Sequence, residues 1–235
     1  MTIVYIDTEH HRVLEHAELS PSYDAKIEMV RDRLATASGQ PCEVQHFTAV
    51  SPTYIEQRAP LALVIGGNLT NWAEFDDADL AELFVTIRTA PVPILGICAG
   101  HQLIGRAHGA AWGPLGTLQR GEVDPDPEFG PGQRKERGFM PVEVNSRCPI
   151  FRDVTPISVM FQHHYWHLEE VPAGFVVQAR SQRSPIQAIE RIDRPVFGVQ
   201  CHVERYDADH PHGEAVLRSF FALARKLTTN GFVTG

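Results

Sequence analysis

The sequence has few cysteines, no long apolar run and no excess of positive charge, and each lack excludes a class of protein. Four cysteines among 235 residues include no C-x-x-C pair, so neither a disulfide scaffold nor a common zinc motif is expected. The first residues lack the basic and apolar regions of a secretory signal, which favours a cytoplasmic protein with free thiols. The longest apolar segments, within 61–65 and 91–97, are too short to cross a bilayer.

The charge balance also limits the partners. A net charge of -8 repels phosphate backbones, so we expect no nucleic-acid partner, and no membrane partner either. With 43% hydrophobic and 21% charged residues the chain can bury an ordinary core. There is no internal repeat and no long linker, so we expect residues 1–235 to form one domain. Nothing in the sequence indicates a cofactor or a metal site.

The amino-terminal half alternates short apolar segments with amphipathic ones, which is typical of strands and helices in turn. The expected strands are 2–6, 42–48, 61–65 and 94–97, and the expected helices lie behind Pro21 and over 76–88 and 99–108. Such alternation predicts an α/β fold with a mostly parallel central sheet and helices on both faces.

The carboxy-terminal half has a different pattern. Residues 121–138 are rich in proline, glycine and charge, so we expect a surface loop whose basic run 134–137 is solvated. Shorter strand candidates follow with hairpin-like spacing, which predicts an antiparallel extension of the main sheet. They are 140–144, 157–161, 175–180, 186–190 and 196–201, before a last helix over 214–227.

The segment PILGICAGHQLIG, residues 93–105, predicts a nucleophile elbow. An apolar strand leads into Cys98 and a helix begins directly after it, with Gly96 and Gly100 two residues away on either side. A side chain at either glycine would clash in so tight a turn. The helix amino-terminus favours a thiolate at Cys98. Taken alone, the pattern fits a buried structural cysteine equally well.

Two further motifs change that balance. His202 follows a late apolar strand, and Glu204 lies two residues on, where an extended chain projects both side chains to one side. A thiolate nucleophile needs such a base and a group that orients it. Gly66 and Gly67 end an earlier strand and expose backbone N–H groups of the kind an oxyanion hole requires. Taken alone, the H-x-E motif is more often a surface pair, and the glycine pair is more often a plain turn after a strand.

In this order the motifs resemble one family, the class I (triad) glutamine amidotransferases. The family pattern G-x-C-x-G-x-Q corresponds to residues 96–102, and its G-V-Q-F-H-P-E motif corresponds to 198–204, read here as G-V-Q-C-H-V-E. The stretches 136–144, 161–190 and 212–221 also look like family segments, so the resemblance covers nearly the whole chain. It implies a flavodoxin-like glutamine amidotransferase fold.

The resemblance also implies the chemistry. Cys98 would attack the carboxamide of glutamine and form a glutamyl thioester, with His202 as base and later acid. Glu204 would orient His202, and the amides of Gly67 and Ala99 would form the oxyanion hole.

The substrate site would use Gln102 and the chain around His164 and Tyr165. Three positions depart from the family pattern: Cys201 and Val203 replace its phenylalanine and proline, and Asn68 replaces the proline that usually ends the glycine loop.

We expect a glutaminase that supplies ammonia to a separate synthetase. The bulky Tyr165 and Trp166, which stand where the family often has glycine and aspartate, also suit a stand-alone hydrolase of γ-glutamyl amides or peptides. A catalytically silent regulatory homologue is the third interpretation. A cluster of Glu9, His10 and nearby histidines matches no common metal pattern and is expected to be a polar loop near the active-site edge.

Overall fold

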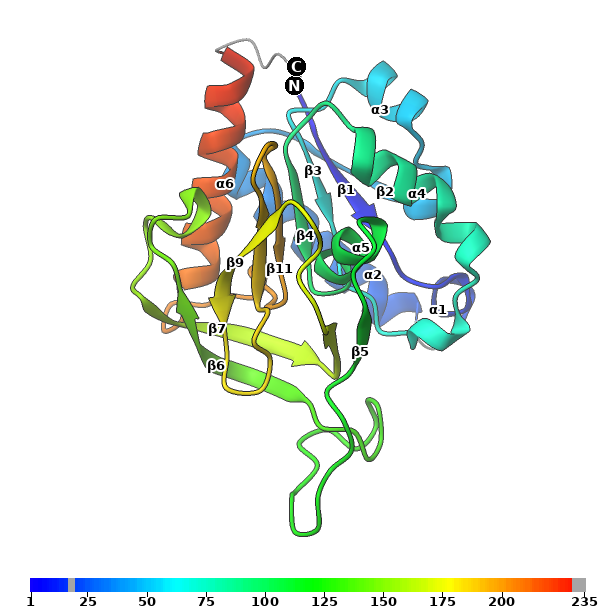
Figure 1. Ribbon diagram of the computed structural model, residues 1–235. Coiled ribbons are helices and arrows are strands. Elements are labelled where there is room, and N and C mark those ends of the chain that lie inside the picture. Colours follow the sequence, from blue (N-terminus) through cyan, green and yellow to red (C-terminus); the bar gives the residue numbers. More distant parts are fainter. Residues whose placement is uncertain (17–19, 230–235) are drawn as a thin grey trace.

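The computed structural model describes residues 1–16 and 20–229, and it is built around a nine-stranded mixed sheet (Figure 1). The strands run in the order β2-β1-β3-β4-β11-β10-β9-β6-β7. Their bounds are β1 (Ile3–Asp7), β2 (Cys42–His46), β3 (Ala62–Ile65), β4 (Ile94–Ile97), β6 (Glu136–Val144), β7 (Ile157–His164), β9 (Phe175–Arg180), β10 (Ala188–Arg191) and β11 (Val196–Val199). A separate two-stranded sheet pairs β5 (Trp112–Pro114) with β8 (Trp166–Leu168).

Helices cover both faces of the sheet. They are α1 (His11–Glu15), α2 (Ser20–Ser38), α3 (Pro52–Arg58), α4 (Asp77–Thr89), α5 (Ala99–Ala107) and α6 (His212–Thr229), with 3-10 turns η1 (Phe47–Ala49), η2 (Trp72–Glu74) and η3 (Pro149–Phe151). Helices α2 and α6 pack over one face, and α4 and α5 cover the other (Figure 1). Two hydrophobic cores result, because successive side chains of each buried strand point to opposite faces.

The sheet has a parallel and an antiparallel half. Strands β2, β1, β3, β4 and β11 pair in parallel, and β10, β9, β6 and β7 extend the sheet in antiparallel fashion. Both halves confirm the predicted fold class. Gly96 of β4 lies opposite Ile65 on one side and Gly198 on the other. The segments that follow β3, β4 and β11 therefore leave the sheet at one edge.

The structure corrects the predicted loop 121–138. Its last residues begin strand β6, and Lys135 and Glu136 are buried, so the basic run 134–137 is not solvated throughout. Strand β11 ends at Val199 and not near His202, since the chain turns away from the sheet there. Helices α1 and α3 and the β5–β8 pair were not predicted. They are short, and a five- or seven-residue helix offers too few turns for a periodic pattern.

Within the described ranges, no helix combines the length and the apolar character that a bilayer-spanning segment needs.

Candidate active site

Cys98 occupies a strained turn between β4 and α5. Its φ of 53° and ψ of -104° are unusual for a residue with a side chain, and its N–H donates to the Val199 carbonyl at 2.8 Å. Both flanking positions must be glycine, because there is no room for a side chain. A Cβ on Gly96 would lie 2.4 Å from the Gly100 oxygen, and one on Gly100 would lie 2.2 Å from the Ile65 oxygen. The predicted elbow and the predicted reason for its glycines are both confirmed.

His202 lies against Cys98 and is held by Glu204. The His202 Nδ1 and Glu204 Oε1 atoms are 2.6 Å apart. Burial lowers the pKa of His202, but the charges of Glu204 and Cys98 outweigh it and raise the pKa to about 10. Burial raises the pKa of Glu204, yet the His202 cation brings it below its usual value. The imidazolium form of His202 is therefore favoured.

The glycine loop after β3 is the third segment that reaches Cys98 and His202. The Gly66 N–H donates to the Ile6 oxygen at 2.9 Å, which continues the parallel ladder to the end of the strand. Gly67 lies close to both His202 and Cys98. A Cβ on Gly67 would be 2.9 Å from His202 Cε1 and 3.3 Å from Cys98 Cβ. Three segments distant in sequence thus meet at one sheet edge.

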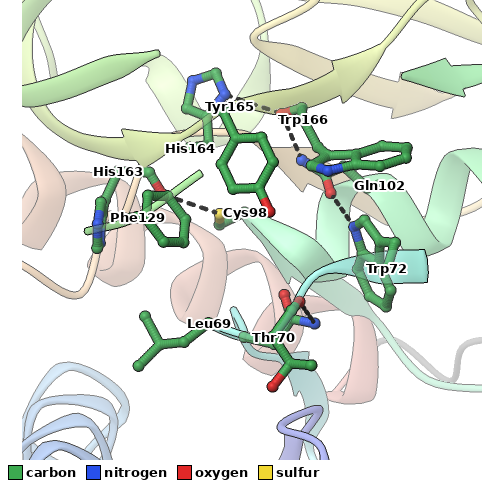
Figure 2. Close-up of a pocket in the computed structure, with 11 residues that line it drawn as sticks. Leu69, Thr70, Trp72, Cys98, Gln102, Phe129, His163, His164, Tyr165 and Trp166 are labelled. Carbon is green, nitrogen blue, oxygen red and sulfur yellow. Dashed lines mark hydrogen bonds between the residues drawn. The ribbon is translucent and has the colours of Figure 1, made fainter. Parts of the chain in front are cut away.

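Two amide side chains, Gln102 and Gln200, connect Cys98 to the pocket wall, and Figure 2 shows the first of them between Trp72 and Trp166. Gln102 accepts from Trp72 Nε1 at 2.7 Å and donates to the Trp166 oxygen at 2.7 Å. It also donates to Gln200 Oε1 at 3.1 Å, and Gln200 Nε2 lies 3.6 Å from Cys98 Sγ. The predicted binding residue Gln102 lines the pocket, but its amide is already engaged within the protein. Sequence reasoning missed Gln200, although it stands in the same motif as His202.

His164 is buried and links two parts of the pocket wall. Its Nε2 lies 3.0 Å from Glu136 Oε2, and its Nδ1 lies 2.9 Å from the Trp166 oxygen. Glu136 also accepts from Ser181 at 2.6 Å and from Gln187 at 2.6 Å. Burial raises the pKa of Glu136, but His164 first, and then the Ser181 hydroxyl, bring it below its usual value. The His164 side chain therefore fixes the wall and does not point freely into the pocket.

Aromatic rings narrow the space over Cys98 (Figure 2). Tyr165 packs edge-on against Phe129 with ring centroids 4.9 Å apart, and Phe129 lies 4.3 Å from the His163 ring. The cavity that these residues share with Cys98 measures about 20 Å³, room for about one water molecule. Tyr165, which was predicted to bind substrate, lines this cavity. Phe129 was missed because it stands in the segment interpreted as a solvated loop.

The other cysteines differ from Cys98. Burial raises the pKa of Cys42 and of Cys148 to about 12 and raises that of Cys201 further, so all three are thiols at neutral pH. A cysteine that burial keeps protonated is a poor nucleophile.

The cluster around Glu9 is not the polar loop that the sequence predicted. Glu9 is completely buried, and residues from His11 onward form helix α1. Among the described residues no three histidine, cysteine or acidic side chains converge in a group that could hold a metal. The carboxylate of Glu9 instead faces the loop that follows Gly67, through hydrogen bonds to Leu69 and Thr70.

Comparison with known families decides the class of protein. A family model described as glutamine amidotransferase class-I matches residues 22–224. The chain belongs to this family. It is thus an enzyme of the glutamine amidotransferase class, as the motifs around Cys98 and His202 predicted.

Several archaeal proteins are similar to this amidotransferase. It is 35% identical over 136 residues to a subunit of the glutamine-hydrolysing GMP synthase of Pyrococcus abyssi, an alignment that covers 58% of this chain and 62% of that one. It is 31% identical over 189 residues to the subunit of the same name from Methanopyrus kandleri, covering 80% and 88%. The chain thus spans less than two thirds of the Pyrococcus relative but most of the Methanopyrus one.

A solved structure supports the fold. A crystal structure from Thermoplasma acidophilum, described as a GMP synthase subunit, superposes with a TM-score of 0.73 at 18% identity, over 98% of this chain and 96% of that one. At this level of identity the likeness concerns the fold.

Proposed function

We propose that this amidotransferase hydrolyses glutamine to glutamate and ammonia through Cys98, His202 and Glu204, and that it passes the ammonia to a separate synthetase subunit. The observation that carries the proposal is that His202, paired with Glu204, and Cys98 both lie beside Gly67 at the elbow. We propose that Cys98 attacks as its thiolate, with the His202 imidazolium beside it as the proton donor.

The reaction follows from that ion pair. The Cys98 thiolate attacks the carboxamide carbon of glutamine, and the N–H groups of Gly67 and Ala99 stabilise the oxyanion that develops. The imidazolium of His202 gives its proton to the departing nitrogen, which leaves as ammonia and leaves a glutamyl thioester. Neutral His202 then takes a proton from water as the water attacks the thioester. Glutamate departs, and the thiolate–imidazolium pair is restored.

The remaining site residues would hold the glutamine. Tyr165 forms one wall, and Gln102 and His164 fix another through the Trp166 carbonyl, which both of them contact. Phe129 lines the same pocket opposite these residues and would contact the substrate or the entrance to it.

The relatives indicate where to look for the partner. The Pyrococcus and Methanopyrus proteins are both named as one subunit of a glutamine-hydrolysing GMP synthase. By analogy, we propose that the ammonia acceptor is bound by a second polypeptide of a GMP-forming synthetase.

A direct test measures glutamate release from glutamine by the purified chain, with and without the second subunit of a GMP synthase. Cys98→Ala is the control. We expect release that is lost in the variant and rises when the second subunit is present. Faster hydrolysis of γ-glutamyl peptides than of glutamine, with no effect of the second subunit, would favour a stand-alone hydrolase. No hydrolysis of either compound by a chain whose Cys98 can still be alkylated would identify a silent homologue.

A further inference from the structure

Glu9 lies two residues beyond the end of β1 and binds the loop that follows Gly67. Its side chain is 0% exposed. The Glu9 Oε2 atom accepts from the Leu69 N–H at 2.7 Å, and Oε1 accepts from the Thr70 N–H at 3.2 Å and the Thr70 hydroxyl at 2.7 Å. Oε1 also accepts from the His10 N–H at 3.0 Å. Both carboxylate oxygens are therefore engaged with backbone donors.

In the described part of the chain, the partners of the Glu9 carboxylate are these uncharged donors. Among the described residues, no lysine, arginine or histidine side chain forms an ion pair with it. Hydrogen bonds to an ionised acceptor are shorter and stronger than those between neutral groups. A buried carboxylate held in this way therefore strongly restrains the backbone that donates to it.

The other end of the loop is fixed separately. The Gly66 oxygen accepts from the Thr8 hydroxyl at 3.0 Å and from the Gly100 N–H at 3.0 Å. Gly67 and Asn68 thus span two anchors, Gly66 on the sheet and Leu69 on Glu9. The position of Gly67 beside Cys98 depends on both anchors, since neither glycine nor asparagine restricts its own backbone as proline would.

We propose that Glu9 is a positioning residue that sets the distance of the Gly67 amide from the carbonyl oxygen of the substrate. The inference rests on the proposed function, because it requires Gly67 to serve the oxyanion. Glu9 does not touch the substrate. It acts through the loop. Its loss should therefore weaken stabilisation of the tetrahedral transition state more than it weakens binding of the substrate.

The test compares Glu9→Gln with the wild type. Glutamine keeps the size of the side chain but turns one acceptor into an N–H₂ group, which faces the donors of the loop. The matched control is Glu170→Gln, because the Glu170 carboxylate also accepts a distant backbone N–H, that of Ala111 at 2.9 Å. Glu170 lies outside the site.

The first readout is hydrogen exchange of the Leu69 and Thr70 amides by NMR, which needs no substrate. We expect exchange at least about tenfold faster in Glu9→Gln, with the amide of Gln102 in helix α5 unchanged. Unchanged exchange at Leu69 and Thr70 would overturn the proposal.

The second readout separates positioning from general damage. We expect kcat for glutamine to fall about 10- to 100-fold with KM within about twofold, because only the transition state loses stabilisation. Alkylation of Cys98 by iodoacetamide forms no oxyanion and should keep its rate. Equal losses of alkylation and kcat, or faster exchange with unchanged kcat, would contradict a positioning role. If the wild type releases no glutamate while Cys98 is alkylated normally, the proposed function fails, and the exchange rates still decide whether Glu9 holds the loop.

Discussion

His202 and Glu204 meet across a turn, with Nδ1 and Oε1 2.6 Å apart, and not along a strand. The chain leaves β11 at Val199, and the Arg205 N–H closes the turn on the His202 oxygen at 3.0 Å. The backbone oxygen of Glu204 accepts from Arg33 of helix α2 at 2.6 Å. The turn is thus tied to a neighbouring helix, which fixes the direction from which the carboxylate approaches the ring.

The first prediction concerns the charge of Glu204. Glu204→Gln removes the anion that most raises the pKa of His202, so that pKa should fall from its value of about 10. Glutamine turnover should drop about 10²- to 10⁴-fold, as expected when a general acid–base group loses its orienting partner. NMR titration of the His202 Cε1 proton measures the first effect. An unchanged titration in the variant would show that Glu204 does not set the charge of His202.

The second prediction concerns stability against pH. The folded-state pKa of His202 lies above its ordinary value of 6.5, so protonation favours the folded state. This contribution is complete below pH 6.5 and is lost as the pH rises towards 10. We expect the difference in unfolding free energy between the wild type and His202→Asn to shrink over that interval. Urea denaturation at several pH values measures it, and a constant difference would contradict the raised pKa.

Much of this architecture could be predicted from the sequence, because its signals are local. The strand before Cys98 is uniformly apolar, and the glycines around it have a steric reason that needs only the immediate turn. The H-x-E spacing correctly paired His202 with Glu204, although the conformation between them was wrong. An i to i+2 contact can form in a turn as well as in a strand.

The parts that could not be predicted depend on long-range contacts. Lys135 looks like a solvated cation in the sequence, but its ammonium is buried and donates to the Phe129 oxygen at 2.6 Å. Glu9 looks like a member of a polar loop, but its partners stand 60 and 61 residues away at Leu69 and Thr70. No periodic pattern indicates such pairs, because each requires knowing which loop lies over the carboxylate or the amine.

The third prediction concerns the glycines of the elbow. A Cβ on Gly100 would lie 2.2 Å from a backbone oxygen, whereas one on Gly39 meets nothing within 4 Å. Gly100→Ala should cost about 3 kcal/mol or more in unfolding free energy, since the backbone itself must shift. Gly39→Ala should cost about 1 kcal/mol, from its φ of 66° alone. Denaturant titration of both variants compares them, and equal losses would refute the steric explanation.

The fourth prediction concerns Lys135. Its ammonium donates to the backbone oxygens of Asp126 and Phe129 at 2.6 Å each, and it forms an ion pair with the Asp124 carboxylate at 2.7 Å. Lys135→Met should loosen the segment over the pocket, so thermolysin should cleave near Phe129 about tenfold faster. The control is Lys226→Met, on an exposed position of helix α6. Equal cleavage of both variants would show that the ammonium does not hold this segment.

The last prediction concerns the ring that covers Cys98. Phe129 packs against Tyr165 and His163, and each such aromatic contact stabilises the closed pocket by about 1 kcal/mol. Phe129→Ala should therefore raise the rate at which iodoacetamide alkylates Cys98 about 30-fold, since the two contacts together contribute about 2 kcal/mol to closure. Phe139→Ala is the matched control, because Phe139 stacks on His210 and does not line the cavity. Mass spectrometry of the Cys98 peptide gives both rates. If Phe129→Ala alkylates no faster than Phe139→Ala, access to the thiol is limited by another wall of the pocket, and Phe129 does not control entry.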